Sequence, residues 1–295
     1  MKWLWFGADN KKNSTDQTAQ SFEQTIADFT EMIKINPHDA IAYYNRGIDY
    51  VKQGKHEQAI SDFTEAIKIN PQFEKAYLNR GVAQGSLGKY EQEIADCTKV
   101  IKISPQFAMA YYNRGVAYGS LGKYEQAIAD YTEGIKINTQ YAEAYCNRGA
   151  AYVNQGKYEQ VIEDCNKAIE INPQYADAYY NRGIAYGSLG KPEQEIADYT
   201  EAIKINLQYA EAYCNRGAAY CALGKFEHAI ADCTEAIKIN PQYTGAYNNR
   251  GVVYYSLGKY EQVRRDWEKV VELDPTGTYG QNARNNLNIL GNMGH

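Results

Sequence analysis

Residues 108–141 read AMAYYNRGVAYGSLGKYEQAIADYTEGIKINTQY, and this pattern returns every 34 residues along the chain. The tripeptide Asn-Arg-Gly marks the interval, because it recurs at the same place in each unit. Seven units follow one another without a gap, at 40–73, 74–107, 108–141, 142–175, 176–209, 210–243 and 244–277. A constant period of this length predicts a repeat protein, in which each unit packs against its neighbours. The units fill 238 of the 295 residues, which leaves no insertion for a catalytic loop.

Each unit carries the signals of two helices joined by a tight turn. In the first unit Gly54 follows the first helical segment, where glycine can adopt the left-handed conformation that caps a helix. Ile60 and Ile67 then recur at helical spacing in the second segment. Pro71 follows that segment, and proline disfavours a helical conformation in the residue before it. Gly47, inside the first segment, is small enough to let the two helices pack closely.

This helix–turn–helix unit, with aromatic, Gly, Tyr, Ala and Pro residues at these offsets, resembles the tetratricopeptide repeat. The resemblance implies an all-α fold, a right-handed α-solenoid superhelix of seven repeats whose first helices line a concave face. We expect a lone helix, a half-repeat, at 21–39 and a capping helix and tail at 278–295. Residues 1–20 are expected to form a polar, disordered tail with an aromatic start.

Charge, hydropathy and cysteine usage exclude several classes of partner. The net charge of −5 argues against a nucleic-acid partner and against binding to an anionic membrane surface. No stretch approaches the roughly 18 consecutive apolar residues of a membrane span, so we expect no integral membrane segment. The six cysteines include no CxxC pair, which predicts free thiols, a cytoplasmic location and no metal site.

Nothing in the sequence indicates catalysis. The four histidines show no HExxH or triad spacing, so we expect no catalytic residues, no cofactor and no enzymatic activity. The prediction is therefore a non-enzymatic adaptor that binds an extended segment of a partner protein in the concave groove.

Two charged columns run through the repeats. One holds arginines at 46, 80, 114, 148, 182, 216 and 250, and the other holds aspartates at 62, 96, 130, 164, 198, 232 and 266. Bidentate Arg–Asp pairs are the obvious interpretation. Pairing can run within a repeat or between neighbours. Asp28 and Arg284 continue the columns beyond the last full units and find partners only between neighbours, so we expect an inter-repeat ladder from Asp28–Arg46 to Asp266–Arg284.

An asparagine precedes every arginine of this column. The column consists of Asn45, Asn79, Asn113, Asn147, Asn181, Asn215 and Asn249. Asparagine is a mediocre helix former, so seven in register suggest a compensating role. Because an amide both donates and accepts, the column can hold the backbone of an extended peptide. The alternative is a structural hydrogen bond to the neighbouring helix.

Neighbouring columns are expected to read the side chains of the bound segment. The floor column holds Ile48, Val82, Val116, Ala150, Ile184, Ala218 and Val252, and another holds Val51, Gly85, Gly119, Val153, Gly187, Cys221 and Tyr255. These residues are mostly small, apolar and uncharged, which suits modest apolar side chains. Tyr44, Tyr112 and Tyr180 are the candidate hot spots, because rigid amphipathic rings dominate such interfaces.

Two residues break the repeat pattern. Glu93 and Glu195 stand where the second helix otherwise has a close-packing residue, and Gln84 is expected to form a compensating hydrogen bond with Glu93.

Two other functions stay open. One alternative function is a self-assembling scaffold that uses the solenoid ends or the N-terminal tail. The other is a regulatory subunit or thiol-sensitive module that acts through Cys214 and Cys221.

Overall fold

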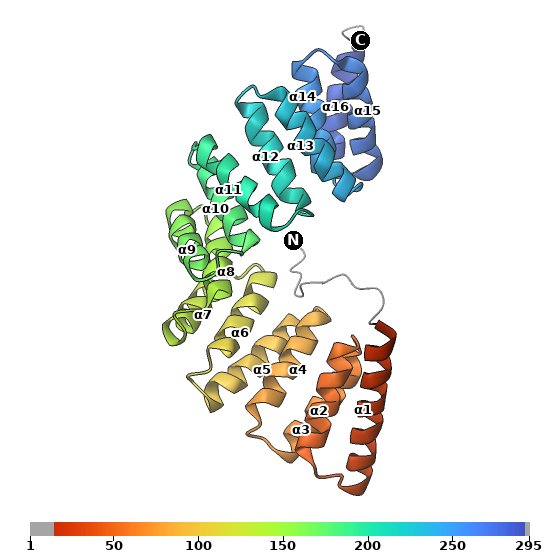
Figure 1. Cartoon of the computed structure of the whole chain (residues 1–295), viewed down its shortest axis with the longest axis vertical. Helices are drawn as coiled ribbons and strands as arrows, with labels where there is room; N and C mark the ends of the chain where they lie inside the picture. The colour runs from red at the N-terminus through yellow and green to blue at the C-terminus, as the bar shows by residue number, and fades with distance from the viewer. Residues whose placement is uncertain (1–14, 293–295) are drawn as a thin grey trace. The chain divides into compact units, whose positions relative to one another are not determined.

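The computed structural model describes residues 15–292, which form sixteen α-helices and no strand (Figure 1). The N-terminal helix is α1 (Thr15–Ile35), and the C-terminal helix is α16 (Thr278–Asn292). The first helices of the repeats are α2 (Ala40–Lys52), α4 (Glu74–Ser86), α6 (Ala108–Ser120), α8 (Ala142–Val153), α10 (Ala176–Ser188), α12 (Ala210–Ala222) and α14 (Thr244–Ser256). The second helices are α3 (His56–Ile69), α5 (Tyr90–Ile103), α7 (Tyr124–Ile137), α9 (Tyr158–Ile171), α11 (Pro192–Ile205), α13 (Phe226–Ile239) and α15 (Tyr260–Leu273).

The chain divides into two compact units, one ending at Thr139 and the other beginning at Gln140. Within each unit the two helices of a repeat pack side by side, and each second helix also contacts the first helix of the next repeat. Neighbouring first helices touch as well, as α4 and α6 do in one unit and α12 and α14 in the other. The all-α repeat fold expected from the sequence is therefore confirmed.

The turn inside each repeat is built on a glycine in the left-handed region. Gly54 has φ 71°, and its counterparts at 88, 122, 156, 190, 224 and 258 have φ between 67° and 74°. In the first repeat, the backbone N–H of Lys55 donates to the carbonyl of Tyr50 at 2.8 Å, which closes the helix end. The predicted glycine caps are confirmed in all seven repeats.

Close packing of the two helices depends on a second glycine. A Cβ atom built on Gly47 would lie 2.7 Å from Cε1 of Phe63, and one built on Gly183 would lie 2.7 Å from Cε1 of Tyr199. No side chain fits there, so the aromatic ring of the second helix lies directly on the backbone of the first. Gly47 therefore offsets its low helix propensity by admitting a large buried ring.

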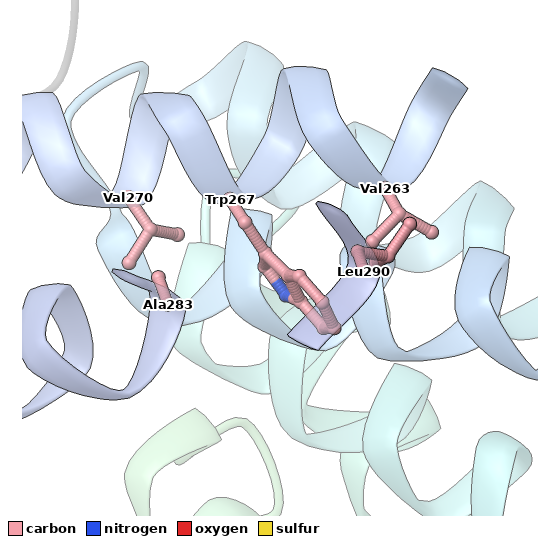
Figure 2. Packing of buried hydrophobic residues seen from close by; sticks show 5 residues of the cluster. All are labelled: Val263, Trp267, Val270, Ala283 and Leu290. Atoms are coloured by element: carbon pink, nitrogen blue, oxygen red, sulfur yellow. The ribbon is translucent and has the colours of Figure 1, made fainter. Parts of the chain in front are cut away.

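The helix α16 covers the last second helix. Figure 2 shows Val263, Trp267 and Val270 of α15 facing Ala283 and Leu290 of α16, and all five side chains are at most 4% exposed. The outer face of α16 carries Asn and Gln residues, as a terminal capping helix requires.

The N-terminal helix starts earlier than the sequence suggested. Helix α1 begins at Thr15, six residues before the predicted start at residue 21. Polar composition favoured a tail here, but Ala19 and Gln20 are good helix formers and extend the helix at little cost. The rest of the predicted tail, residues 1–14, lies outside the described residues, as do residues 293–295.

The arginine column pairs within repeats, so the predicted inter-repeat ladder is wrong. Arg46 donates from Nε and Nη2 to the two carboxylate oxygens of Asp62, at 2.8 and 2.7 Å. The same bidentate pair joins Arg80 to Asp96, Arg114 to Asp130, Arg148 to Asp164, Arg182 to Asp198, Arg216 to Asp232 and Arg250 to Asp266. At the ends, Asp28 accepts from Gln24, and Arg284 donates to the carbonyl of Pro275.

Antiparallel packing explains why the pair forms inside the repeat. Arg46 and Asp62 lie at equal distances along the chain from the turn at Gly54, so the hairpin places them opposite each other. The glycine at 47 then brings the two helices close enough for direct contact.

The link between repeats is a third hydrogen bond from the same arginine. Arg46 Nη1 donates to the hydroxyl of Thr30 in the preceding second helix, at 3.0 Å. Arg80, Arg114, Arg216 and Arg250 bind Thr64, Thr98, Thr200 and Thr234 in the same way, and Arg182 binds Asn166. Each of these arginines therefore ties three helices together.

Candidate functional site

The candidate site is the surface that the first helices of successive repeats share, called here the first-helix face. Its floor column, Ile48 to Val252, is half-exposed or exposed in every repeat. Val82 and Val252 are 37% and 41% exposed, and Ala218 is exposed as well. The structure thus leaves a row of apolar side chains accessible within each compact unit.

The asparagine column lies between neighbouring first helices. The amide of Asn79 donates to the hydroxyl of Tyr44 at 2.9 Å, and that of Asn215 donates to the hydroxyl of Tyr180 at 3.1 Å. Asn181 and Asn249 donate to sulfur atoms, of Cys146 and Cys214 respectively. These four amides therefore make the structural hydrogen bond to the neighbouring helix that the sequence left open as an alternative.

The candidate tyrosines are less accessible than the floor. Tyr112 is 3% exposed, so it presents little surface to a partner. Tyr44 and Tyr180 are half-buried, and each packs against two aromatic rings at centroid distances of 4.9–5.8 Å. Burial raises the pKa of Tyr180 to about 12, so its hydroxyl stays neutral.

A pocket of about 350 Å³ opens on the first-helix face of the second unit. Its walls come from three helices: α10, α11 and α12. It is lined by Ile184, Gly187, Ser188, Glu195, Tyr199, Asn215 and Ala218. Ile184, Gly187, Asn215 and Ala218 belong to the predicted groove columns, and the structure brings these four together. Ser188 and Tyr199 are not among the predicted site residues. Tyr199 belongs to a second helix, and its ring lies against Gly183 of the first helix.

Glu195 is the only charged side chain that lines this pocket. The structure places its carboxylate against the backbone of Gly187, because a Cβ atom built there would lie 2.6 Å from Cδ and Oε1. Burial raises the pKa of Glu195 above its ordinary value of 4.5. A half-buried carboxylate therefore meets an apolar, accessible surface.

Glu93 occupies the equivalent position three repeats earlier and is almost sealed. It is 6% exposed, and burial raises its pKa to about 8. The predicted hydrogen bond with Gln84 is absent from the hydrogen bonds of the described residues, and Gln84 Oε1 is buried without a partner. The compensation expected between these two side chains is therefore wrong.

The cysteines are poor candidates for redox chemistry. Five of the six are buried, and only Cys221 is half-buried. Burial raises the pKa of Cys146 to about 12 and that of Cys214 to about 11, and it raises the pKa of Cys221 as well. Because the thiolate is the reactive form, these environments disfavour oxidation and metal binding.

The described residues contain no group of three or more His, Cys, Asp or Glu side chains that could hold a metal ion. Across the same part of the chain, no helix is long and apolar enough to cross a membrane.

Comparison with protein-family models finds matches along most of the chain. The tetratricopeptide repeat model fits residues 40–73, 142–175, 210–243 and 245–276. Related models of the same repeat fit 74–107, 97–129, 118–156 and 165–197. The chain belongs to the tetratricopeptide repeat family. In this tetratricopeptide repeat chain, the arginine of the Asn-Arg-Gly motif forms the bidentate Arg–Asp pair described above in every repeat. This pair is called the clamp of the repeat.

Solved structures confirm the tetratricopeptide repeat fold. The Cut9 and Hcn1 hetero-tetramer of the APC/C matches with a TM-score of 0.69 at 16% identity, over 89% of this chain and 52% of that one. This chain therefore spans about half the length of that relative. A tetratricopeptide repeat protein from Parabacteroides merdae matches with a TM-score of 0.65 at 21% identity, over 83% of this chain and 96% of the other.

A third solved structure is YrrB, described as a TPR protein with an unusual peptide-binding site. It matches with a TM-score of 0.51 at 22% identity, over 64% of this chain and 97% of that one. The comparison with curated proteins found no match. Tetratricopeptide repeats are protein-interaction modules and in general non-enzymatic, which is the coarse function that the family supports.

Proposed function

We propose that this protein is a non-enzymatic adaptor whose first-helix face binds an extended segment of a partner protein. The observation that carries the proposal is the accessible floor column, which presents one apolar side chain in each repeat. In the second unit the pocket at Glu195 lies beside this column. An extended segment that crosses successive repeats would meet these positions at regular intervals. Contiguous apolar surface of this kind marks interaction sites in soluble proteins.

In this proposal the asparagine column plays two roles. Its amide N–H groups brace neighbouring helices, as in Asn79 and Asn215, while the amide oxygens accept from the backbone of the bound segment. Tyr44 and Tyr180, which are half-buried, contribute the accessible part of their side chains. We also propose a cytoplasmic location, because all six cysteines are free.

A charge-insertion experiment tests the adaptor role. The bait is the full chain with Val82→Glu, Ala218→Glu and Val252→Glu, three exposed floor positions. The matched control carries Ala95→Glu, Ala197→Glu and Ala231→Glu, three exposed positions on second helices. Both are checked for wild-type helicity by circular dichroism and used to capture proteins from a lysate of the source cell. Loss of specific partners from the floor variant alone supports the proposal, and equal loss or equal retention contradicts it.

Self-assembly is a second candidate, favoured by apolar side chains on the terminal helix. Tyr279 and Ile289 of α16 are 49% and 50% exposed, and Ile289 lines a smaller pocket with Tyr255 and Trp267. Light scattering over a range of protein concentrations tests this function. A mass that rises with concentration in the wild type, and not in Ile289→Lys, supports self-assembly.

A further inference from the structure

The pocket at Glu195 has a feature that the general adaptor role does not explain. The second-helix position of Glu195 holds Ala or Val in five other repeats: Ala59, Ala127, Val161, Ala229 and Val263. All five are fully buried. A carboxylate there has no packing role that Ala cannot fill, and it needs Gly187 beside it to make room.

Among the described residues, no ion pair joins the carboxylate of Glu195 to a cation, and no cationic side chain lines its pocket. The other lining residues are neutral, with Ser188 on α10, Tyr199 on α11 and Asn215 on α12 as the polar ones. On the same helix Asp198 pairs with Arg182 and Lys204 pairs with Glu201, while Glu193 carries the same charge as Glu195 and is exposed. Burial alone accounts for the raised pKa of Glu195, with no nearby cation acting against it. The pocket thus keeps a partly desolvated negative charge that an incoming cation would neutralise.

The shape of the pocket suits a long basic side chain. Its volume of about 350 Å³ falls at the lower end of the range for ligand pockets, about 300–1,000 Å³. Ile184 and Ala218 supply an apolar wall for a methylene stem, and Glu195 supplies the anion for the charged end. Lysine and arginine bury their stems in this way while their charged ends find a polar partner.

We infer that the Glu195 pocket receives a lysine or arginine side chain of the bound protein segment. The inference rests on the proposed function, since it assigns a chemistry to one position of the segment on the first-helix face. It gives the adaptor a preference for partners with a basic residue flanked by small or apolar ones. The floor column supplies affinity along the segment, and Glu195 fixes its register.

Selection from a displayed library of random linear peptides tests this inference. The full chain is immobilised, and enriched peptides are compared between wild type, Glu195→Gln and the matched control Glu193→Gln. Glu193 is exposed on the same helix, so the control removes the same charge outside the pocket. Glu195→Ala provides a further variant whose folding is assured by the alanine that other repeats carry there.

The enriched peptide is then synthesised with its basic residue and with norleucine in that place. The expected result is a basic residue at one constant position in the wild-type selection. Glu195→Gln and Glu195→Ala should bind the basic peptide at least about tenfold more weakly, and the norleucine peptide as wild type does. Glu193→Gln should behave as wild type.

Different results would overturn the basic-residue preference and the adaptor role. Peptides that bind with no constant basic position, or a basic peptide that Glu195→Gln binds unchanged, would overturn the inference and leave the adaptor role standing. Failure to enrich any peptide on the wild-type chain would overturn the proposed function and the inference together.

Discussion

Glu93 and Glu195 hold the same position of the repeat, yet Glu93 is 6% exposed and Glu195 lines an open pocket. Both carboxylates lie against a glycine of the first helix, Gly85 or Gly187. The neighbours differ: Tyr199 and Ala218 line the Glu195 pocket, and the equivalent residues near Glu93 are Cys97 and Val116. The same departure from the repeat pattern thus gives a buried carboxylate in one unit and an accessible one in the other, beside neighbours of different size.

The largest change in stability is expected at the Arg–Asp pair, which the repeats of Glu93 and Glu195 share. Arg80→Ala and Arg182→Ala should each destabilise the protein by about 3–5 kcal/mol, because each leaves a buried aspartate without its ion pair. Asp96 and Asp198 are both 5% exposed, so the two losses should be equal within error. Urea unfolding of both variants measures this, with the exposed Arg265→Ala as the control. A clearly smaller loss for one of them would show that the two clamps are not equivalent.

The next largest change in stability is expected to differ between the Glu93 and Glu195 sites. Glu93→Ala should stabilise the protein by about 2–4 kcal/mol above pH 8, because it removes a buried carboxylate. Since the folded pKa of Glu93 is about 8 against an ordinary 4.5, wild-type stability should fall as pH rises through this window. The gain should vanish below pH 4.5, where the carboxyl is protonated in both states.

Urea unfolding across this pH range gives the comparison, and Glu91→Ala, exposed on the same helix, is the control. Glu195→Ala should give a smaller gain because the pocket admits solvent. A gain that does not depend on pH would contradict burial of the Glu93 charge.

The glycines beside the two carboxylates should respond unequally. Gly85→Ala should destabilise by about 1–3 kcal/mol, because the new methyl group meets the Glu93 carboxylate in a closed site. Gly187→Ala should cost less, since Glu195 can turn toward the pocket and alanine gains up to about 1 kcal/mol of helix propensity. Thermal unfolding measures both, and Glu93→Ala should rescue Gly85→Ala. Equal losses at the two glycines would argue that the Glu195 site is closed as well.

The smallest effect should come from the surface of the second helices. Lys204 and Glu201 form an ion pair at 2.6 Å with side chains 63% and 46% exposed. In the earlier repeat Lys99 stands at the position of Glu201, so this pair has no counterpart there. Lys204→Ala should change stability by at most about 0.5 kcal/mol, and less in high salt. A loss above about 1 kcal/mol in urea unfolding would mean that exposed pairs carry part of the difference between the regions.

Sequence alone was sufficient for the repeat and its turns. The 34-residue interval fixed the helix pairs, and the glycines after the first helices appear with positive φ in all seven repeats. These features are local, because each follows from helix period or backbone sterics within one unit. The early start of α1 was missed because polar composition does not distinguish a tail from an exposed helix.

The sequence alone did not decide whether each arginine pairs within its own repeat or with the neighbouring repeat. Asp62 and Asp28 are both placed symmetrically with Arg46 about a turn, at Gly54 and Pro37 respectively, so the columns fit either choice. The rotation of each helix about its axis decides the matter, and the close approach of the two helices at the glycine after each arginine accompanies the pairing within the repeat. The threonines that also bind the arginines, such as Thr30, carry no charge that would mark them in the sequence as partners.

The candidate site was predicted only in part, because packing between helices also decides which of its residues are accessible. Periodicity placed Ile184, Gly187, Asn215 and Ala218 in groove columns, and the structure gathers them around one pocket. Burial depends on neighbours of varying size, so the sequence did not indicate that Tyr112 is buried while Ala218 is exposed. It marked Glu93 and Glu195 as exceptions without separating them.

Carbon-13 NMR titration of the glutamate carboxyls tests most directly whether Glu93 is sealed and Glu195 is open to a partner. Glu93→Gln and Glu195→Gln assign the two signals. Glu93 should titrate with a pKa of about 8 whether or not the selected basic peptide is present. The raised pKa of Glu195 should fall when that peptide is added, because the bound cation stabilises the carboxylate. A Glu195 signal that ignores the peptide, or a Glu93 that titrates near its ordinary 4.5, would contradict the distinction between the two sites.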